Sequence, residues 1–266
     1  MRAEALASQA RLYFTSRAHG SHHMTFPPNP HASTTRVWCI DLNASLAALL
    51  MLEAEVPRLS DADRSRASRF SSGQAAREWM AAHVALRLVL EHSLGSGARR
   101  IPFRVSPSGK PDLPDSGIAF SLSHGAGHAL IATGPVGPLG VDIEGGRAIR
   151  MAGDRRTSIE SAGAGLSSQA LPFEPDARFL QAWVRLEALS KAQGEGLARV
   201  LSRAGAFGAG RGKGVSGTLL PGEIQVSDLA LGSGLYAAVA MAVGATGAHV
   251  GFLPAQADEL RAFALA

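Results

Sequence analysis

The segment LGVDIE, residues 139–144, predicts a strand in which two carboxylates alternate with apolar side chains, and it decides the fold expected of this chain. Alternate side chains of a strand point to opposite faces, so Asp142 and Glu144 share one face and the apolar residues beside them share the other. Two carboxylates roughly 7 Å apart repel each other, and a cation removes that repulsion. Oxygen-only ligands suit Mg²⁺, and a polar strand end that faces solvent is the alternative interpretation.

A third carboxylate lies on the segment WVRLEALSK, residues 183–191. Apolar residues at spacings of three and four predict a helix over residues 176–194, on which Trp183, Glu187 and Lys191 follow one stripe. A surface Glu–Lys pair would explain this stripe. Because the stripe borders the apolar face, a half-buried Glu187 would need a partner. A metal ion shared with the two carboxylates of the strand would supply that partner.

The segment FSLSH, residues 120–124, ends a predicted strand with Ser123 and His124. Neighbouring strand residues face opposite ways, so this pair is not a catalytic dyad. The hydroxyl, the imidazole and the backbone N–H can still bind phosphate oxygens. A structural histidine is the alternative for His124.

The remaining pattern predicts further strands and helices in two successive units. We expect strands at residues 36–44, 101–107, 118–124, 128–134, 139–144, 222–231 and 235–243, and helices within residues 45–70, 73–95 and 176–194. Residues 145–174 predict mostly loop with some helix, and residues 205–217 a glycine-rich loop. Two β/α units of comparable size indicate an α+β fold of two subdomains packed side by side.

Composition narrows the class of protein. The chain has 266 residues and a formal net charge of +4, a mild basic excess that suits an anionic ligand or an acidic partner. The excess is too small to indicate nucleic-acid binding. The single cysteine, Cys39, excludes an internal disulfide and fits a cytoplasmic protein. No apolar run approaches the roughly 18 residues of a membrane span, so no membrane partner is expected.

Four segments, in their order and spacing, resemble the Sfp-type 4'-phosphopantetheinyl transferases. They are GKP at 109–111, FSLSH at 120–124, GVDIE at 140–144 and WVRLEALSKAQGEG at 183–196. The resemblance covers residues 36–245. It implies transfer of the 4'-phosphopantetheine arm of coenzyme A to a serine of an apo acyl or peptidyl carrier protein, with release of 3',5'-ADP. Mg²⁺ would be the cofactor and would bridge the pyrophosphate.

By position, the resemblance also implies roles for individual residues. Asp142, Glu144 and Glu187 would form the metal site. Glu187, or a water that it orients, would be the base for the carrier serine, and Lys191 would contact the phosphates. Asp142, Glu187 and Lys191 are thus the implied catalytic residues. Coenzyme A would be bound by Arg66, Lys110, Pro111, Ser123, His124 and Lys191, with Arg77 a lesser candidate.

The resemblance implies two similar α/β subdomains related by pseudo-twofold symmetry, with the active site in the cleft between them. We expect an N-terminal extension at residues 1–35, subdomains at 36–139 and 140–250, and a C-terminal tail at 251–266. A chain that holds both subdomains needs no second copy to build the cleft, so a monomer is expected.

One departure from the family keeps other functions open. Many members have lysine immediately before the helix glutamate, where this chain has Leu186. A coenzyme A-binding or regulatory homologue without turnover is therefore an alternative. A Mg²⁺-dependent phosphohydrolase built on the same three acids is another. The sequence does not indicate whether a carrier of fatty-acid or of secondary-metabolite biosynthesis would be served.

Overall fold

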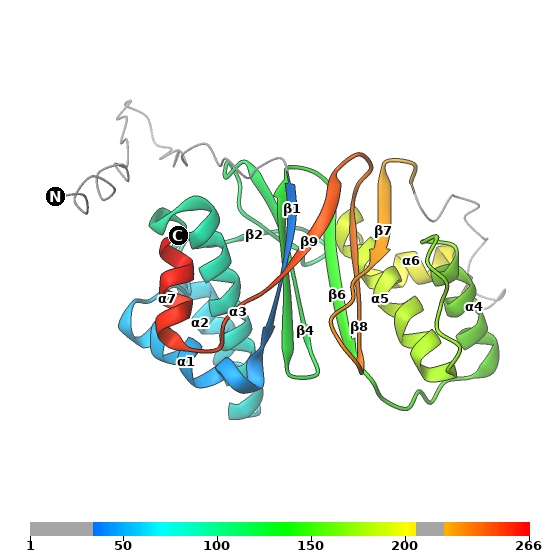
Figure 1. The fold of residues 1–266 in the computed structure, drawn as a ribbon, viewed down its shortest axis with the longest axis horizontal. Coiled ribbons are helices and arrows are strands. Elements are labelled where there is room, and N and C mark those ends of the chain that lie inside the picture. Colours follow the sequence, from blue (N-terminus) through cyan, green and yellow to red (C-terminus); the bar gives the residue numbers. More distant parts are fainter. Residues whose placement is uncertain (1–33, 206–220) are drawn as a thin grey trace.

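The computed structural model describes residues 34–205 and 221–266 and has a mixed α/β architecture, consistent with the α+β prediction (Figure 1). Two sheets lie between two outer groups of helices. Within the described residues, none of the helices is both long enough and apolar enough to cross a membrane. The pseudo-twofold symmetry and the cleft between subdomains stay predictions.

The first sheet has four strands and the second has three. The first has the order β4-β5-β1-β9, from Ile118–Gly125, His128–Pro135, Thr34–Asp41 and Thr246–Phe252. The second has the order β6-β8-β7, from Leu139–Gly145, Leu235–Ala242 and Ile224–Asp228. A short hairpin pairs β2 (Arg104–Val105) with β3 (Pro111–Asp112). β6 is thus an edge strand, and the edge that β8 does not pair faces β4.

The helices cover the outer face of each sheet (Figure 1). On the first sheet lie α1 (Leu42–Glu55), α2 (Asp61–Ala67), α3 (Gly73–Leu94), the short 3₁₀ turn Ser96–Ala98 and α7 (Ala257–Leu265). On the second lies α5 (Pro175–Gln193), against which α4 (Gly153–Ala164) and α6 (Leu197–Arg203) pack. Apolar side chains of β1, β5, β6 and β8 fill the space between the sheets.

Local sequence explains where α5 begins and ends. The side chain of Glu174 accepts a hydrogen bond from the backbone N–H of Ala177, and Pro175 occupies the first helical position. Gly194 ends the helix in the left-handed conformation, with φ of 64°. The helix predicted over residues 176–194 is therefore confirmed to within one residue.

Three features differ from the expected boundaries. β9 pairs in parallel with β1, so residues 246–252 join the first sheet instead of completing a C-terminal subdomain that ends at residue 250. α7 then packs against α3 and α1, and residues 251–266 are not a separate tail. The expected boundary between residues 139 and 140 falls inside β6. Long-range strand pairing caused these differences, and local patterns do not encode it.

Other predicted segments are compared with the structure next, and some of them lie outside the described residues. Residues 145–174 were predicted to be mostly loop with some helix, and the helical part is α4 in the middle of this region. The strand expected at residues 101–107 is only the two-residue β2. Most of the predicted extension, residues 1–33, and most of the glycine-rich loop, residues 206–217, lie outside the described residues.

Candidate active site

The alternation predicted for β6 is confirmed. Val141 and Ile143 are buried in the apolar layer between the two sheets. Asp142 points to the opposite face, toward α5, and is only 4% exposed. Glu144 lies two residues further along the same face and is partly exposed. The packing of one sheet on the other therefore turns both carboxylates toward the helix that carries Glu187.

Asp142 receives two hydrogen bonds on the same oxygen. Ser123 Oγ, from β4, donates to Asp142 Oδ1 over 2.7 Å. Lys191 Nζ, from α5, donates to the same Oδ1 over 2.7 Å and also to the Val141 carbonyl over 3.0 Å. Three elements that are distant in the sequence thus meet at one carboxylate oxygen. Two donors and the ammonium of Lys191 fix the orientation of this buried carboxyl group.

Glu187 lies in an environment that disfavours its negative charge. Burial raises the pKa of Glu187 from its ordinary value of 4.5 to about 7, and the nearby charges of Asp142 and Glu144 add to the rise. Lys191 and the Trp183 side chain act in the opposite direction. The three predicted acids are therefore close enough to interact electrostatically, as the spacing of the two segments led us to expect.

Glu144 is the most accessible of these acids. Arg147, three residues along the chain, lies 3.5 Å from its Oε2. Burial raises the pKa of Glu144, and Arg147 partly offsets this effect.

Within residues 34–205 and 221–266, no group of three or more His, Cys, Asp or Glu side chains is arranged so that it could hold a metal ion. The magnesium site stays a prediction.

Ser123 and His124 face opposite sides of β4, as predicted. Ser123 is buried and bonded to Asp142, whereas His124 is exposed and lies on the side of α3. The ring of His124 makes an edge contact with His83, whose ring stacks on Trp79. Burial lowers the pKa of His83 to about 4, so His83 is a neutral member of this cluster at pH 7.

Lys110 and Pro111 lie on the β2–β3 hairpin beside a cavity of about 360 Å³. The lining also includes Ser106, Phe120 and Gly194, the residue that ends α5. Lys110 Nζ donates to the Leu139 carbonyl over 2.9 Å, on the edge of β6 that β8 does not pair. This cavity therefore lies beside the strand that carries Asp142.

The two arginine candidates are on the surface. Arg66 is exposed on α2 and Arg77 is exposed on α3. In the described part of the chain, no hydrogen bond or ion pair joins either side chain to Asp142, Ser123 or Lys191. The structure thus does not bring Arg66 or Arg77 into contact with the carboxylate cluster.

Sequence reasoning overlooked Ser121. Its hydroxyl accepts a hydrogen bond from the backbone N–H of Val141 over 3.2 Å, which satisfies a donor on the open edge of β6. The signal was present, because Ser121 and Ser123 share one face of β4. Two buried hydroxyls on one face of a strand can bond to the polar groups of a neighbouring edge strand. Such side-chain hydrogen bonds replace the backbone hydrogen bonds that a paired strand would supply.

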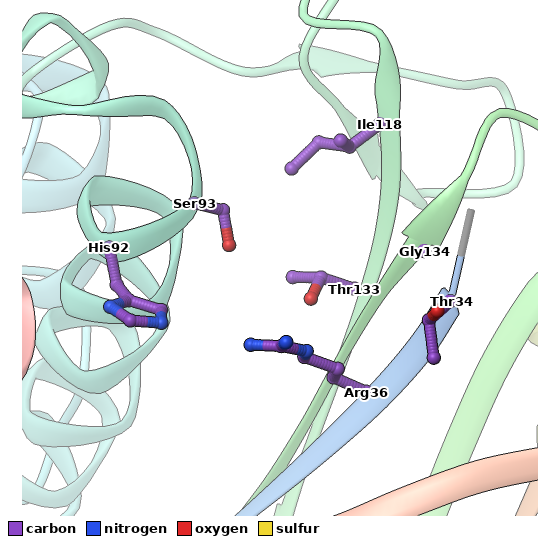
Figure 2. Close-up of a pocket in the computed structure, with 7 residues that line it drawn as sticks. All are labelled: Thr34, Arg36, His92, Ser93, Ile118, Thr133 and Gly134. Carbon is purple, nitrogen blue, oxygen red and sulfur yellow. The ribbon is translucent and has the colours of Figure 1, made fainter. Parts of the chain in front are cut away.

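A second, much smaller cavity lies elsewhere. It has a volume of about 10 Å³ between the C-terminal part of α3 and the first sheet, and Figure 2 shows Arg36, His92 and Ser93 directed toward it. This is about the volume that one water molecule needs. None of the predicted site residues lines it, so it is separate from the candidate active site.

Comparison with known proteins identifies the family. No family model matches the chain. It is 30% identical over 184 residues to the 4'-phosphopantetheinyl transferase HetI of Nostoc sp. (strain PCC 7120), an alignment that covers 65% of this chain and 75% of that protein. It is 28% identical over 89 residues, 32% of this chain and 36% of the relative, to the "putative 4'-phosphopantetheinyl transferase slr0495" of Synechocystis sp. (strain PCC 6803). The chain therefore belongs to the 4'-phosphopantetheinyl transferase superfamily.

Proposed function

We propose that the protein transfers the 4'-phosphopantetheine arm of coenzyme A to a serine of an apo acyl or peptidyl carrier protein and releases 3',5'-ADP. The observation that carries the proposal is the meeting of Asp142, Glu187 and Lys191 beside β4, in a chain of this superfamily. The basic net charge of +4 favours an acidic carrier through electrostatic attraction. All of these residues come from one chain, which supports action as a monomer.

Mg²⁺ is the cofactor that we propose from the chemistry of the donor set, although in the described residues the three carboxylates are not arranged as a metal site. Three carboxylates interact closely enough that Asp142 and Glu144 help to raise the pKa of Glu187. A divalent cation would relieve this repulsion, and oxygen-only donors suit Mg²⁺. Asp142, Glu144 and Glu187 would hold it. When bound, Mg²⁺ would offset the charge of the pyrophosphate during transfer.

The protein's own residues would bind and orient the reactants. The carrier serine hydroxyl attacks the phosphorus of the pantetheine phosphate, and the bond from that phosphorus to the leaving 3',5'-ADP breaks. Glu187, or a water that it orients, accepts the serine proton as the general base. Lys191 places its positive charge 2.7 Å from Asp142 and stabilises the developing negative charge.

Coenzyme A would lie between this cluster and the cavity beside the β2–β3 hairpin. Lys110 and Pro111 line that cavity and would contact the nucleotide. His124 is exposed near the ammonium of Lys191 and would contact a phosphate. Ser123 is bonded to Asp142, so its contribution would be mainly to orient that carboxylate. Arg66, which is exposed on α2, would need to reach a flexible part of the ligand.

The decisive experiment is incubation of the protein with coenzyme A, Mg²⁺ and a panel of apo-carrier proteins, read by the mass of the carrier. The expected result is a gain of one phosphopantetheine group on at least one carrier, and its loss when EDTA removes the metal. Asp142→Ala and Glu187→Ala should abolish the gain in folded protein. Glu259→Ala, which removes an exposed acid from α7, is the matched control and should keep full activity.

A coenzyme A-binding homologue without turnover is the second candidate, because Leu186 replaces the lysine usual in the family. Leu186 lies on the buried face of α5, within the apolar core, and offers no phosphate contact. This candidate predicts calorimetric binding of coenzyme A and no modified carrier. Full activity of Asp142→Ala would instead contradict the role proposed for Asp142, while the proposed transfer reaction would still hold.

A further inference from the structure

We propose that Gly140 is a positioning residue, which lets α5 approach β6 closely enough for Lys191 to reach Asp142. The proposal rests on the proposed function for its kinetic consequence. Its structural consequence stands on the geometry of α5 and β6 alone. Gly140 lies two residues before Asp142 and on the same face of the strand, so it lies directly beneath the helix.

The space at Gly140 excludes any side chain. A Cβ atom there would lie 2.1 Å from the Ala188 carbonyl oxygen, 2.6 Å from the Ala192 backbone nitrogen and 3.0 Å from the Lys191 Cβ. Ordinary van der Waals contact begins at 3.4 Å. Two of the three neighbours are helix backbone, which cannot rotate away. An added methyl group would therefore move α5 outward by about 1 Å at Ala188.

Glycine is required here for space and not for backbone conformation. Gly140 is absent from the glycines with positive φ, and it forms a regular antiparallel pair with Ala240 on β8. An alanine would adopt the same backbone angles without strain. The close approach to α5 is the feature that only glycine permits.

The contacts of Lys191 depend on that approach. Ala188, Lys191 and Ala192 are spaced three and four residues apart, so they form the face of α5 that lies on Gly140. From this face, Lys191 Nζ donates to Val141 over 3.0 Å and to Asp142 over 2.7 Å. An outward shift of about 1 Å would take both contacts beyond hydrogen-bond length. Glu187, next to Ala188, would move in the same direction.

The chain offers a matched control in Gly163. A Cβ at Gly163, on α4, would lie 2.5 Å from the Ala182 Cβ and 2.6 Å from its Cα. Gly163→Ala would therefore also loosen packing against α5, at a point about two and a half turns before Lys191. Both variants should lose stability, and only Gly140→Ala should disturb the contacts of Lys191.

The first test measures how fast the Lys191 amine reacts with a trace of an amine-reactive reagent, normalised to the unfolded protein. This measurement needs neither coenzyme A nor a carrier, so it is independent of the proposed function. We expect Gly140→Ala to raise the reactivity of Lys191 several-fold, and Gly163→Ala to leave it at the wild-type level. Equal reactivity in Gly140→Ala and wild type would overturn the proposal.

The second test is kinetic. If the wild type transfers phosphopantetheine, Gly140→Ala should lower kcat by roughly tenfold to a hundredfold, as a misplacement of about 1 Å does, with a smaller change in KM for the carrier. In the Lys191→Met background, Gly140→Ala should have little further effect on kcat, because both changes remove the same contact. Fully independent effects would contradict the proposal.

The glycine variants could also fail to fold, and this result would decide the proposal as well. Both glycine variants are measured with sucrose, which favours the folded state. If Gly140→Ala stays unfolded under these conditions, the glycine serves folding alone and the positioning role is rejected.

Discussion

Lys191 Nζ and Ser123 Oγ both donate to the same oxygen of Asp142, each over 2.7 Å. These two donors come from α5 and β4, which belong to opposite halves of the chain. The arrangement fixes the orientation of the carboxylate and satisfies one oxygen, while no described side chain donates to the other. A carboxylate held in this way is prepared to use its second oxygen for a ligand.

The first prediction concerns Ser123. Ser123→Ala removes one of the two donors that orient Asp142, so the Mg²⁺ concentration needed for half-maximal transfer should rise by roughly tenfold or more. Titration of the transfer rate with Mg²⁺ measures this. Ser121→Ala, on the same strand face, is the control. It leaves the Val141 N–H unpaired and should lower the free energy of unfolding by about 1–3 kcal/mol without changing the Mg²⁺ requirement. Equal Mg²⁺ requirements in both variants would contradict this role of Ser123.

The second prediction concerns pH. Burial, with help from Asp142, raises the pKa of Glu187 from 4.5 to about 7, so the folded state holds this proton more tightly than the unfolded state. The resulting stabilisation is fully present below pH 4.5 and is lost as the pH rises through about 7. In metal-free protein, the free energy of unfolding should therefore fall over this range, and it should fall less in Glu187→Gln. Denaturant unfolding at a series of pH values measures this. An identical slope in the two proteins would show that Glu187 does not carry the effect.

The third prediction concerns a buried ion pair that supports α5 from its far side. Arg185 is fully buried and forms two hydrogen bonds with Asp228, of 2.6 and 2.7 Å. Asp228→Asn leaves the guanidinium without its counter-charge and should lower the free energy of unfolding by about 3 kcal/mol. Thermal and denaturant unfolding check this. Asp61→Asn breaks an exposed pair with Arg64 and should change stability by less than about 1 kcal/mol. A loss no larger in Asp228→Asn than in this control would refute the expectation.

The fourth prediction separates two roles of Lys110. Its ammonium donates to the Leu139 carbonyl, and it lines the cavity proposed for the nucleotide. Lys110→Met should lower the free energy of unfolding by about 1–3 kcal/mol, because a strand carbonyl loses its partner, and should weaken coenzyme A binding. Arg104→Met removes a charge from the same cavity but no contact with β6. It should leave stability nearly unchanged. Calorimetric titration with coenzyme A, together with unfolding curves, distinguishes the two effects.

Much of the site follows from local patterns. Strand alternation predicted that Asp142 and Glu144 would face away from Val141 and Ile143, and helix periodicity predicted a half-buried Glu187. Both signals depend on neighbours within about eight residues, which is the range over which backbone geometry fixes the direction of a side chain. The order of the four motifs led further, to the family.

Other features had no local signal. No local pattern indicated that Ser123 and Lys191 are both bonded to Asp142. β9 was assigned to the C-terminal half, and it pairs with β1. These contacts join residues that lie tens to hundreds of positions apart, so their partners depend on how the sheets pack.

The sequence by itself determined which side chains β6 and α5 present, where α5 begins and ends, and which superfamily the chain resembles, because each of these is written in short-range periodicity, capping residues and motif order. The tertiary structure alone decided that Lys191 and Ser123 share one oxygen of Asp142, and that a bare Gly140 sets how closely α5 lies on β6. Contact between distant elements is settled by packing volume and by the pairing of buried polar groups, and both exist only after the two sheets have come together.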